Sequence, residues 1–251
     1  MSDGLPVLWQ YSFSNYNEKA RWALDFKGIR HRRHSVMPGW PRNLWLSRGD
    51  RTLPLLDLDA RRIMDSTRII AALEERVTDP ALYPADPEER RRALELEDYF
   101  DEELGPHIRR AVYQELLPHP DLVVPLFTEG ASPFTRGVLR AGFPVLRVGM
   151  RRFMNIYEEP AARSRVKCVE VLDSLERELG DNEYLVGDSF SIADLTAASL
   201  FYPIALPAEF PYTSPSWDEL PEGARDFLGE MRERPGAHWV GEMYRRHRLP
   251  A

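Results

Sequence analysis

The segment Val7–Gly28, VLWQYSFSNYNEKARWALDFKG, decides the fold of this chain. Its first four residues are mostly apolar and are followed by polar turn-forming residues, which predicts a short buried strand. The next part carries apolar residues at i, i+3 and i+4, the spacing of one helix face. Gly28 follows the last of them, where a helix end favours a residue with left-handed backbone. The segment therefore predicts a strand, a turn and a helix in that order.

The start of this predicted helix has the composition of an anion site. Asn15 and Glu18 have the spacing of a capping box, in which each side chain binds a free amide of the first turn. Ser14 then lies just before the cap with a free hydroxyl, beside the positive end of the helix. A hydroxyl and bare helix amides suit an anion such as a thiolate. On pattern alone, Ser14 could equally be an ordinary helix-capping residue.

Composition narrows the class of protein. The 251 residues have room for one large domain or two smaller ones, and 43% are hydrophobic, as in soluble globular proteins. The net charge of −7 argues against non-specific nucleic-acid binding. The single cysteine, Cys168, excludes an internal disulfide framework, and its apolar setting predicts an inert buried thiol.

Targeting and metal signals are weak. The first residues lack the basic and apolar regions of a secretory signal. The longest nearly apolar run, Leu195–Leu206, is too short to span a bilayer. Glu103 and His107 are four residues apart, as metal ligands can be, but no further ligand has useful spacing. We therefore expect a cytoplasmic protein with no metal, no membrane partner and no nucleic-acid partner.

The chain divides into a mixed part and a helical part. A second strand is predicted over Ile29–Val36 and a third over Thr52–Leu58, where Pro54 restricts the strand start to an edge, an entry or a turn. A short return strand and a helix capped by Asp65-Ser66-Thr67 follow. A proline-rich linker then leads into helices only. The predicted domains are residues 1–78 and 91–251, joined by a linker over residues 79–90.

The helical part contains several predicted helices and one irregular segment. Ser191 and Asp194 form a capping-box start for a strongly apolar helix, and Phe210–Glu222 is proline-rich and irregular. The other predicted helices are Glu88–Leu117 (whole or broken at Gly105-Pro106), Pro133–Glu158, Pro160–Leu179 and Gly223–Met243 with a break at Pro235.

Four motifs in this order carry a resemblance to a known family: SFSNYNEKARWAL (12–24), RTLPLLDLD (51–59), MDSTRII (64–70) and NEYLVGDSFSIADLTAASL (182–200). The chain resembles the cytosolic glutathione transferase superfamily, and is similar to serine-type bacterial members. The resemblance implies an α+β protein, with a thioredoxin-like N-terminal domain followed by an all-helical C-terminal domain. It also implies a cis proline in the second motif and a homodimer.

The resemblance implies roles for residues of the first motif. Ser14 falls where serine-type members place the hydroxyl that donates to the glutathione thiolate. Tyr16 and Asn17 fall beside it as further catalytic candidates, and Asn17 occupies a place where some relatives have a cysteine. Without a cysteine in this turn, thiol–disulfide chemistry is disfavoured. Asn15 departs from the proline often found at its position.

Other implied ligand-binding residues lie further along the chain. Leu53 and Pro54 would present backbone groups to the cysteinyl part of glutathione, and Asp65 and Ser66 would bind its γ-glutamyl end. The loop that often contacts the glycyl carboxylate contains Trp40 and Arg51, the binding candidates there, together with Arg42 and Arg48.

Arg109 would lie near the cleft between the two domains in this fold and is a further candidate for the site.

Two functions remain open from the sequence. The first is an enzyme of detoxification that activates glutathione, or another small thiol, for attack on a hydrophobic electrophile. The second is a non-catalytic module that binds ligands or proteins. Asn15 in place of proline, the short Asp65 side chain and the irregular Phe210–Glu222 segment motivate the second.

Overall fold

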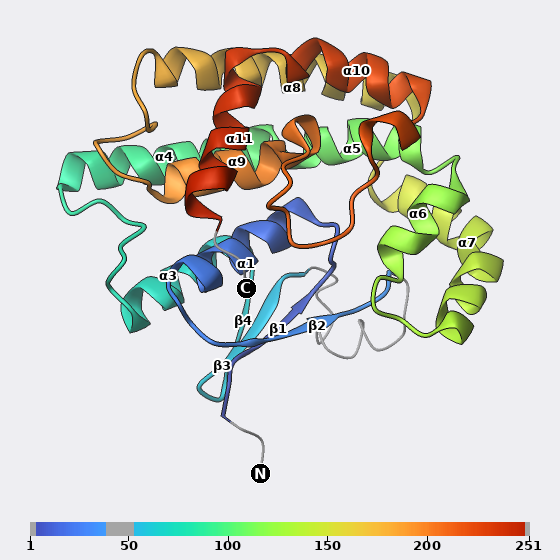
Figure 1. Ribbon diagram of the computed structural model, residues 1–251, viewed down its shortest axis with the longest axis horizontal. Helices are drawn as coiled ribbons and strands as arrows, with labels where there is room; N and C mark the ends of the chain where they lie inside the picture. Colours follow the sequence, from blue (N-terminus) through green and yellow to red (C-terminus); the bar gives the residue numbers. More distant parts are fainter. Residues whose placement is uncertain (1–3, 39–52, 249–251) are drawn as a thin grey trace.

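A computed structural model of the chain describes residues 4–38 and 53–248 (Figure 1). Its N-terminal part contains a four-stranded sheet and two helices: β1 (Val7–Gln10), α1 (Asn15–Phe26), β2 (Arg32–Ser35), β3 (Leu55–Leu58), β4 (Arg61–Met64) and α3 (Ser66–Arg76). The strand order is β2-β1-β3-β4. β1 runs parallel to β2 and antiparallel to β3, and β3 pairs with β4 as a hairpin. This is the thioredoxin-like arrangement predicted from the sequence.

The connections explain this topology. Parallel strands need a crossover, and α1 supplies it between β1 and β2. Gly28 adopts φ +62° just after α1, as predicted for the residue that ends this helix. α1 and α3 contact each other and lie between the sheet and the helices of the second part (Figure 1). α1 is therefore buried on two sides.

The C-terminal part is helical, as predicted. Its elements are α4 (Pro87–Glu103), α5 (Gly105–Leu116), α6 (Pro120–Phe127), α7 (Pro133–Phe153), α8 (Glu158–Leu179), α9 (Ile192–Ala205), a 3-10 turn η1 (Trp217–Glu219), α10 (Glu222–Arg232) and α11 (Pro235–His247). Of the two alternatives for Glu88–Leu117, the structure has the helix broken at Gly105, and the break predicted at Pro235 is also present. None of these helices, within the described ranges, is long and apolar enough to cross a membrane.

The helical part differs from the prediction at two places, one additional helix and one helix boundary. α6 was not predicted, because Pro120 and Pro125 obscure its pattern; Pro120 takes the first helical position, where its missing amide costs nothing. The break between α7 and α8 falls at Asn155, which adopts φ +52°, and not at Pro160. Pro160 lies in the first turn of α8, a position that tolerates proline.

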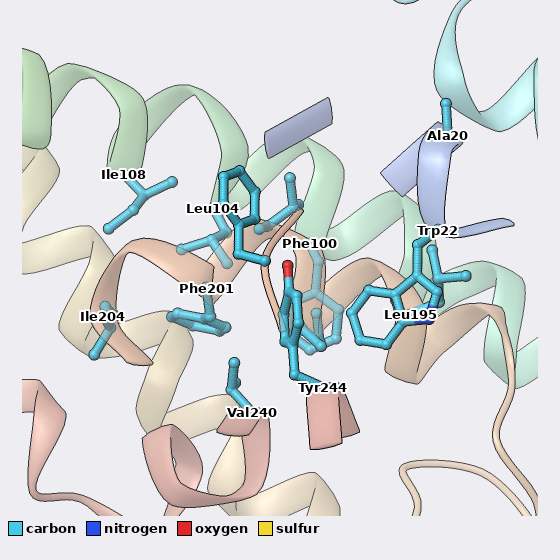
Figure 2. Packing of buried hydrophobic residues seen from close by; sticks show 14 of the residues in the cluster. Ala20, Trp22, Phe100, Leu104, Ile108, Leu195, Phe201, Ile204, Val240 and Tyr244 are labelled. Carbon is cyan, nitrogen blue, oxygen red and sulfur yellow. The ribbon is translucent and has the colours of Figure 1, made fainter. Parts of the chain in front are cut away.

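α9 is the centre of the hydrophobic core. It contacts α1, α4 and α11, and nearly all of its residues are buried. Figure 2 shows its Leu195 and Phe201 surrounded by side chains of α1, α4 and α11, including Trp22 and Tyr244, whose ring centroids are 4.4 Å apart. The apolar run in the sequence is therefore a buried core helix.

Two further predictions concern buried polar groups. The capping box of α9 is present, since Asp194 accepts hydrogen bonds from the Ser191 amide and hydroxyl, both at 2.8 Å. Cys168 is fully buried in α8, and burial raises the pKa of its thiol to about 12. This cysteine is therefore protonated at neutral pH, consistent with the predicted inert thiol.

Candidate functional site

Ser14 is the N-cap of α1, and its side chain makes no capping hydrogen bond. The predicted capping box between Asn15 and Glu18 is wrong. Asn15 is the first helical residue, and its side-chain oxygen accepts from the Tyr16 amide at 3.0 Å. Glu18 is fully buried and binds two guanidinium groups, from Arg21 at 2.8 Å and from Arg248 at 2.6 Å. Both partners of Glu18 are therefore guanidinium groups, and the Ser14 hydroxyl makes no capping hydrogen bond.

The turn before α1 is held by Arg21. Its guanidinium donates to the side chain of Gln10 at 2.9 Å and to the carbonyls of Tyr11 and Ser12 at 3.3 and 3.0 Å. The Tyr202 hydroxyl of α9 donates to the carbonyl of Phe13 at 2.7 Å. Sequence reasoning missed both positioning residues. The i, i+3 spacing of Glu18 and Arg21 hints at the first, but nothing in the apolar pattern around Tyr202 indicates the second.

Ser14 lines a cavity of about 450 Å³ between the two parts of the molecule. The N-terminal wall also includes Tyr16 and Leu53, and the opposite wall comes from α5, α7, α9 and the segment after α9. Most lining side chains are apolar, among them Phe13, Val112, Leu146, Met150, Phe153 and Leu206. The cavity thus offers a hydroxyl at a helix start on one side and an apolar chamber on the other.

Tyr16 and Asn17, the two other catalytic candidates, are already engaged. The Tyr16 hydroxyl donates to the carbonyl of Asp101 in α4 at 2.6 Å, while its ring lines the cavity. Burial and the Asp101 charge raise the pKa of Tyr16 above its usual value, so it stays protonated. Asn17 is fully buried, is not part of the cavity wall, and accepts from the Tyr11 amide at 3.2 Å. Both side chains hold the turn in place.

The sheet register brings the other predicted residues to one edge. Leu55 pairs with Trp9 of β1 on one side and with Met64 of β4 on the other. Leu53-Pro54 precedes β3, and Asp65-Ser66 follows β4, so both dipeptides lie at the edge where β1 leads towards Ser14. The Leu53–Pro54 peptide bond is cis, as the resemblance implied. Leu53 lines the cavity and its backbone lies beyond the last pair of the strand ladder.

Asp65 and Ser66 start the second helix at this edge. Asp65 is exposed, adopts φ +77° and caps α3 by accepting from the Arg68 amide at 3.2 Å. Ser66 is 3% exposed, and neither residue lines the 450 Å³ cavity. A left-handed backbone costs a non-glycine residue about 1–3 kcal/mol, and such strain clusters at ligand sites. Trp40 and Arg51 lie outside the described residues.

Family models match both parts of the chain. The glutathione S-transferase N-terminal domain matches residues 8–81, and the glutathione S-transferase C-terminal domain matches residues 158–229. The two matches together cover more than half of the sequence. The chain belongs to the glutathione S-transferase superfamily. No curated protein sequence matches it.

Several solved structures share its fold. The β-etherase LigF from Sphingobium sp. strain SYK-6 is 18% identical with a TM-score of 0.62, and the match covers 94% of this chain and 98% of that one. A glutathione S-transferase from Methylobacterium radiotolerans in complex with glutathione sulfonate is 22% identical, with a TM-score of 0.55 and coverage of 93% and 92%. A theta-class enzyme from Xanthomonas axonopodis pv. citri with glutathione bound is 18% identical, with a TM-score of 0.53 and coverage of 94% and 96%. At these identities the likeness establishes the fold.

The site of this glutathione S-transferase-like protein combines two helix starts with a cis-proline strand. The starts of α1 and α3 both lie at one sheet edge, and each provides unpaired amides that favour anionic groups. In the part of the chain that the structure describes, no group of three His, Cys, Asp or Glu side chains could hold a metal ion. The arrangement suits a small peptide-like thiol at the sheet edge and an apolar molecule in the adjoining cavity.

Proposed function

We propose that this chain is a glutathione transferase-like enzyme in which Ser14 stabilises the glutathione thiolate. One observation carries the proposal. The Ser14 hydroxyl lies at the start of α1 without a capping partner, on the wall of an apolar cavity of about 450 Å³. A thiolate placed there would accept from the hydroxyl and lie in the favourable field of the helix.

The hydrogen bond from Ser14 and the helix N-terminus contribute about as much free energy as the thiolate requires. A free thiol titrates near pH ~8.5, and lowering its pKa by about two units requires ~2.7 kcal/mol of preferential thiolate stabilisation. A hydrogen bond to a charged group contributes about 1.5–3 kcal/mol. A helix N-terminus contributes about 0.3–2 kcal/mol. Together these two interactions supply the required stabilisation without a cysteine or a metal in the turn.

The other parts of glutathione fit the sheet edge beside Ser14. We assign the backbone of Leu53 to the cysteinyl part of the thiol, and Asp65 and Ser66 to the amine and carboxylate of its γ-glutamyl end. Asp65 attracts the amine, while the start of α3 favours the carboxylate. Trp40 and Arg51 are the candidates for the glycyl carboxylate. Resemblance alone supports a cytoplasmic homodimer with a role in detoxification.

On binding, glutathione releases its thiol proton to solvent, and the thiolate then attacks a hydrophobic electrophile. The new bond joins the sulfur to the electrophilic carbon, and the leaving group departs with its electron pair. The apolar lining from α5 and α7 excludes water from the reacting atoms, which strengthens the hydrogen bond to the thiolate.

The test is a titration of the bound thiol in the wild type and in Ser14→Ala. Thiolate absorbance should show a depressed pKa for wild-type-bound glutathione, and the variant should return it about one to two units towards the free value. Turnover of an activated aryl halide should fall about 10- to 100-fold at neutral pH. Tyr16→Phe is the matched control, since its hydroxyl already donates to Asp101.

Two outcomes would contradict the proposal. An unchanged thiol pKa and unchanged turnover in Ser14→Ala would remove Ser14 from the mechanism. Glutathione binding without turnover across a panel of electrophiles would favour the non-catalytic ligand-binding module.

A further inference from the structure

Arg109 places an uncompensated positive charge in the cavity wall. It lies in the first turns of α5 and lines the cavity together with Ser14. Its Nε is buried without a hydrogen-bond partner, and its guanidinium makes no ion pair with any described residue. Leaving a buried donor of a charged group unpaired is costly, so such a group points to a missing ligand.

Two nearby carboxylates and the neighbouring arginine have other partners. The Asp101 carboxylate binds Lys19 at 2.5 Å and accepts from Thr67 at 3.0 Å. Glu103 pairs with Lys167 at 2.5 Å. Arg110, the next residue of α5, turns away from the cavity and donates to Ser164 at 2.8 Å and to the carbonyl of Met154 at 3.2 Å. Among the described residues that line the cavity, Arg109 is therefore the one with a charged side chain.

Tyr113 adds a second donor on the same helix face. It lies one turn after Arg109, an i, i+4 spacing that puts both side chains side by side, and it lines the same cavity. Its hydroxyl makes no hydrogen bond with the described part of the chain. Burial raises the pKa of Tyr113 well above its usual value, so the hydroxyl keeps its proton and can donate.

We propose that this cavity selects amphipathic anions, with an apolar body against α7 and a carboxylate or sulfonate bound by Arg109 and Tyr113. A planar guanidinium binds such oxyanions through two parallel hydrogen bonds. The surrounding apolar side chains exclude water and strengthen this interaction. The inference deepens the proposed function, because it names the class of electrophile that would meet the thiolate at Ser14.

The test compares two dyes with one skeleton, in the absence of any thiol. 8-Anilinonaphthalene-1-sulfonate carries the anion, and N-phenyl-1-naphthylamine lacks it. By fluorescence titration, Arg109→Gln should weaken binding of the sulfonate about 10- to 100-fold and change binding of the neutral dye less than about threefold. Arg109→Lys should recover part of the lost affinity for the sulfonate, since lysine keeps the positive charge but cannot form the two parallel hydrogen bonds of a guanidinium.

The control is Arg163→Gln, which removes the same charge from an exposed side chain paired with Glu159 outside the cavity. It should leave both dyes unchanged, and circular dichroism should show that all variants are folded. Equal losses for the two dyes, or no loss for the sulfonate, would overturn the inference.

Two further measurements complete the test. The first asks whether Arg109 binds the anion of the apolar ligand or a carboxylate of glutathione. The second distinguishes a failure of this inference from a failure of the proposed thiolate mechanism. If Arg109→Gln weakens glutathione binding in calorimetry and leaves the dye preference intact, Arg109 binds a peptide carboxylate and the inference is wrong. Ser14→Ala should retain the preference for the sulfonate dye, so a failed thiol mechanism and a failed anion site give different results.

Discussion

At the scale of single residues, Ser14 and Tyr16 both carry hydroxyls at the start of α1, but only the Tyr16 hydroxyl has a partner in the other part of the molecule. Tyr16→Phe should therefore lower the free energy of unfolding by about 0.5–1.5 kcal/mol, the net contribution of one hydrogen bond. Urea unfolding measures this change. The pKa of bound thiol should stay within a few tenths of a unit; a rise like that of Ser14→Ala would give Tyr16 a catalytic role.

Gly105 packs closely against Tyr16. A Cβ at this position would lie 2.0 Å from the Tyr16 hydroxyl oxygen, so Gly105→Ala must displace Tyr16 from Asp101. We expect a loss of about 1–3 kcal/mol in the free energy of unfolding. Gly142→Ala is the matched control: this glycine is exposed inside α7, with nothing within 4 Å of an added Cβ. That variant should gain about 0.5–1 kcal/mol in urea unfolding. Two equal effects would contradict the close-packing argument.

The residues of the site differ in how far sequence could predict them. The turn before α1 and the entry of β3 after Pro54 follow from local patterns, and the structure has both. The free hydroxyl of Ser14 was predicted from a capping box that the structure lacks, since Ser14 itself is the N-cap. The partners of Glu18 do not, because Arg248 lies 230 positions away and the local alternative, a capping box with Asn15, fits the sequence equally well. A contact between distant segments leaves no periodic signal.

At the scale of elements, the start of α9 contains a titrating group in the core. Burial raises the pKa of Asp194 to about 6, despite its hydrogen bonds from Leu185 and Ser191. A carboxyl whose folded pKa exceeds its unfolded value of about 3.9 stabilises the fold fully below pH ~4 and loses this contribution as pH rises through about 6. The total is of the order of 3 kcal/mol.

Asp194→Asn should remove this pH dependence. The difference in free energy of unfolding between wild type and variant should become less favourable to the wild type as pH rises from about 4 to about 6. Glu219→Gln is the control, because Glu219 forms the same capping box with Ser216 but is exposed, and its hydrogen bonds from Ser216 lower its pKa. Denaturant unfolding at several pH values measures both. A flat difference for Asp194→Asn would show that the native pKa is unshifted.

The helix boundaries differ in whether a short sequence motif is enough to predict them. The start of α9 was predicted correctly, since the capping box lies within four residues of sequence. The start of α8 was placed at Pro160 because proline often marks a helix start, but Asn155 makes the reversal with a left-handed backbone. α6 has two prolines in eight residues and is helical because its apolar residues are buried. Tertiary burial overrides propensity in such a short element.

At the scale of the whole molecule, the C-terminal end of the described chain connects the helical part to the turn before α1. Arg248 is 4% exposed and binds Glu18 at 2.6 Å and Asp25 at 2.7 Å, both in α1. Glu18 in turn binds Arg21, which holds the carbonyls of Tyr11 and Ser12. A chain of buried charges thus runs from the end of α11 to the turn that presents Ser14. Removing its last member leaves buried carboxylates without one of their partners.

Arg248→Ala should therefore lower the free energy of unfolding by about 3–5 kcal/mol, the cost of breaking a buried ion pair. Its reference is Arg245→Ala, where a similar guanidinium pairs with Glu242 at an exposed site and should change stability by less than about 1 kcal/mol. Chemical denaturation gives both values. If the network also positions Ser14, the pKa of bound thiol should rise in Arg248→Ala and stay unchanged in Arg245→Ala. A large loss of stability with an unchanged thiol pKa would confine the network to holding the two parts of the molecule together.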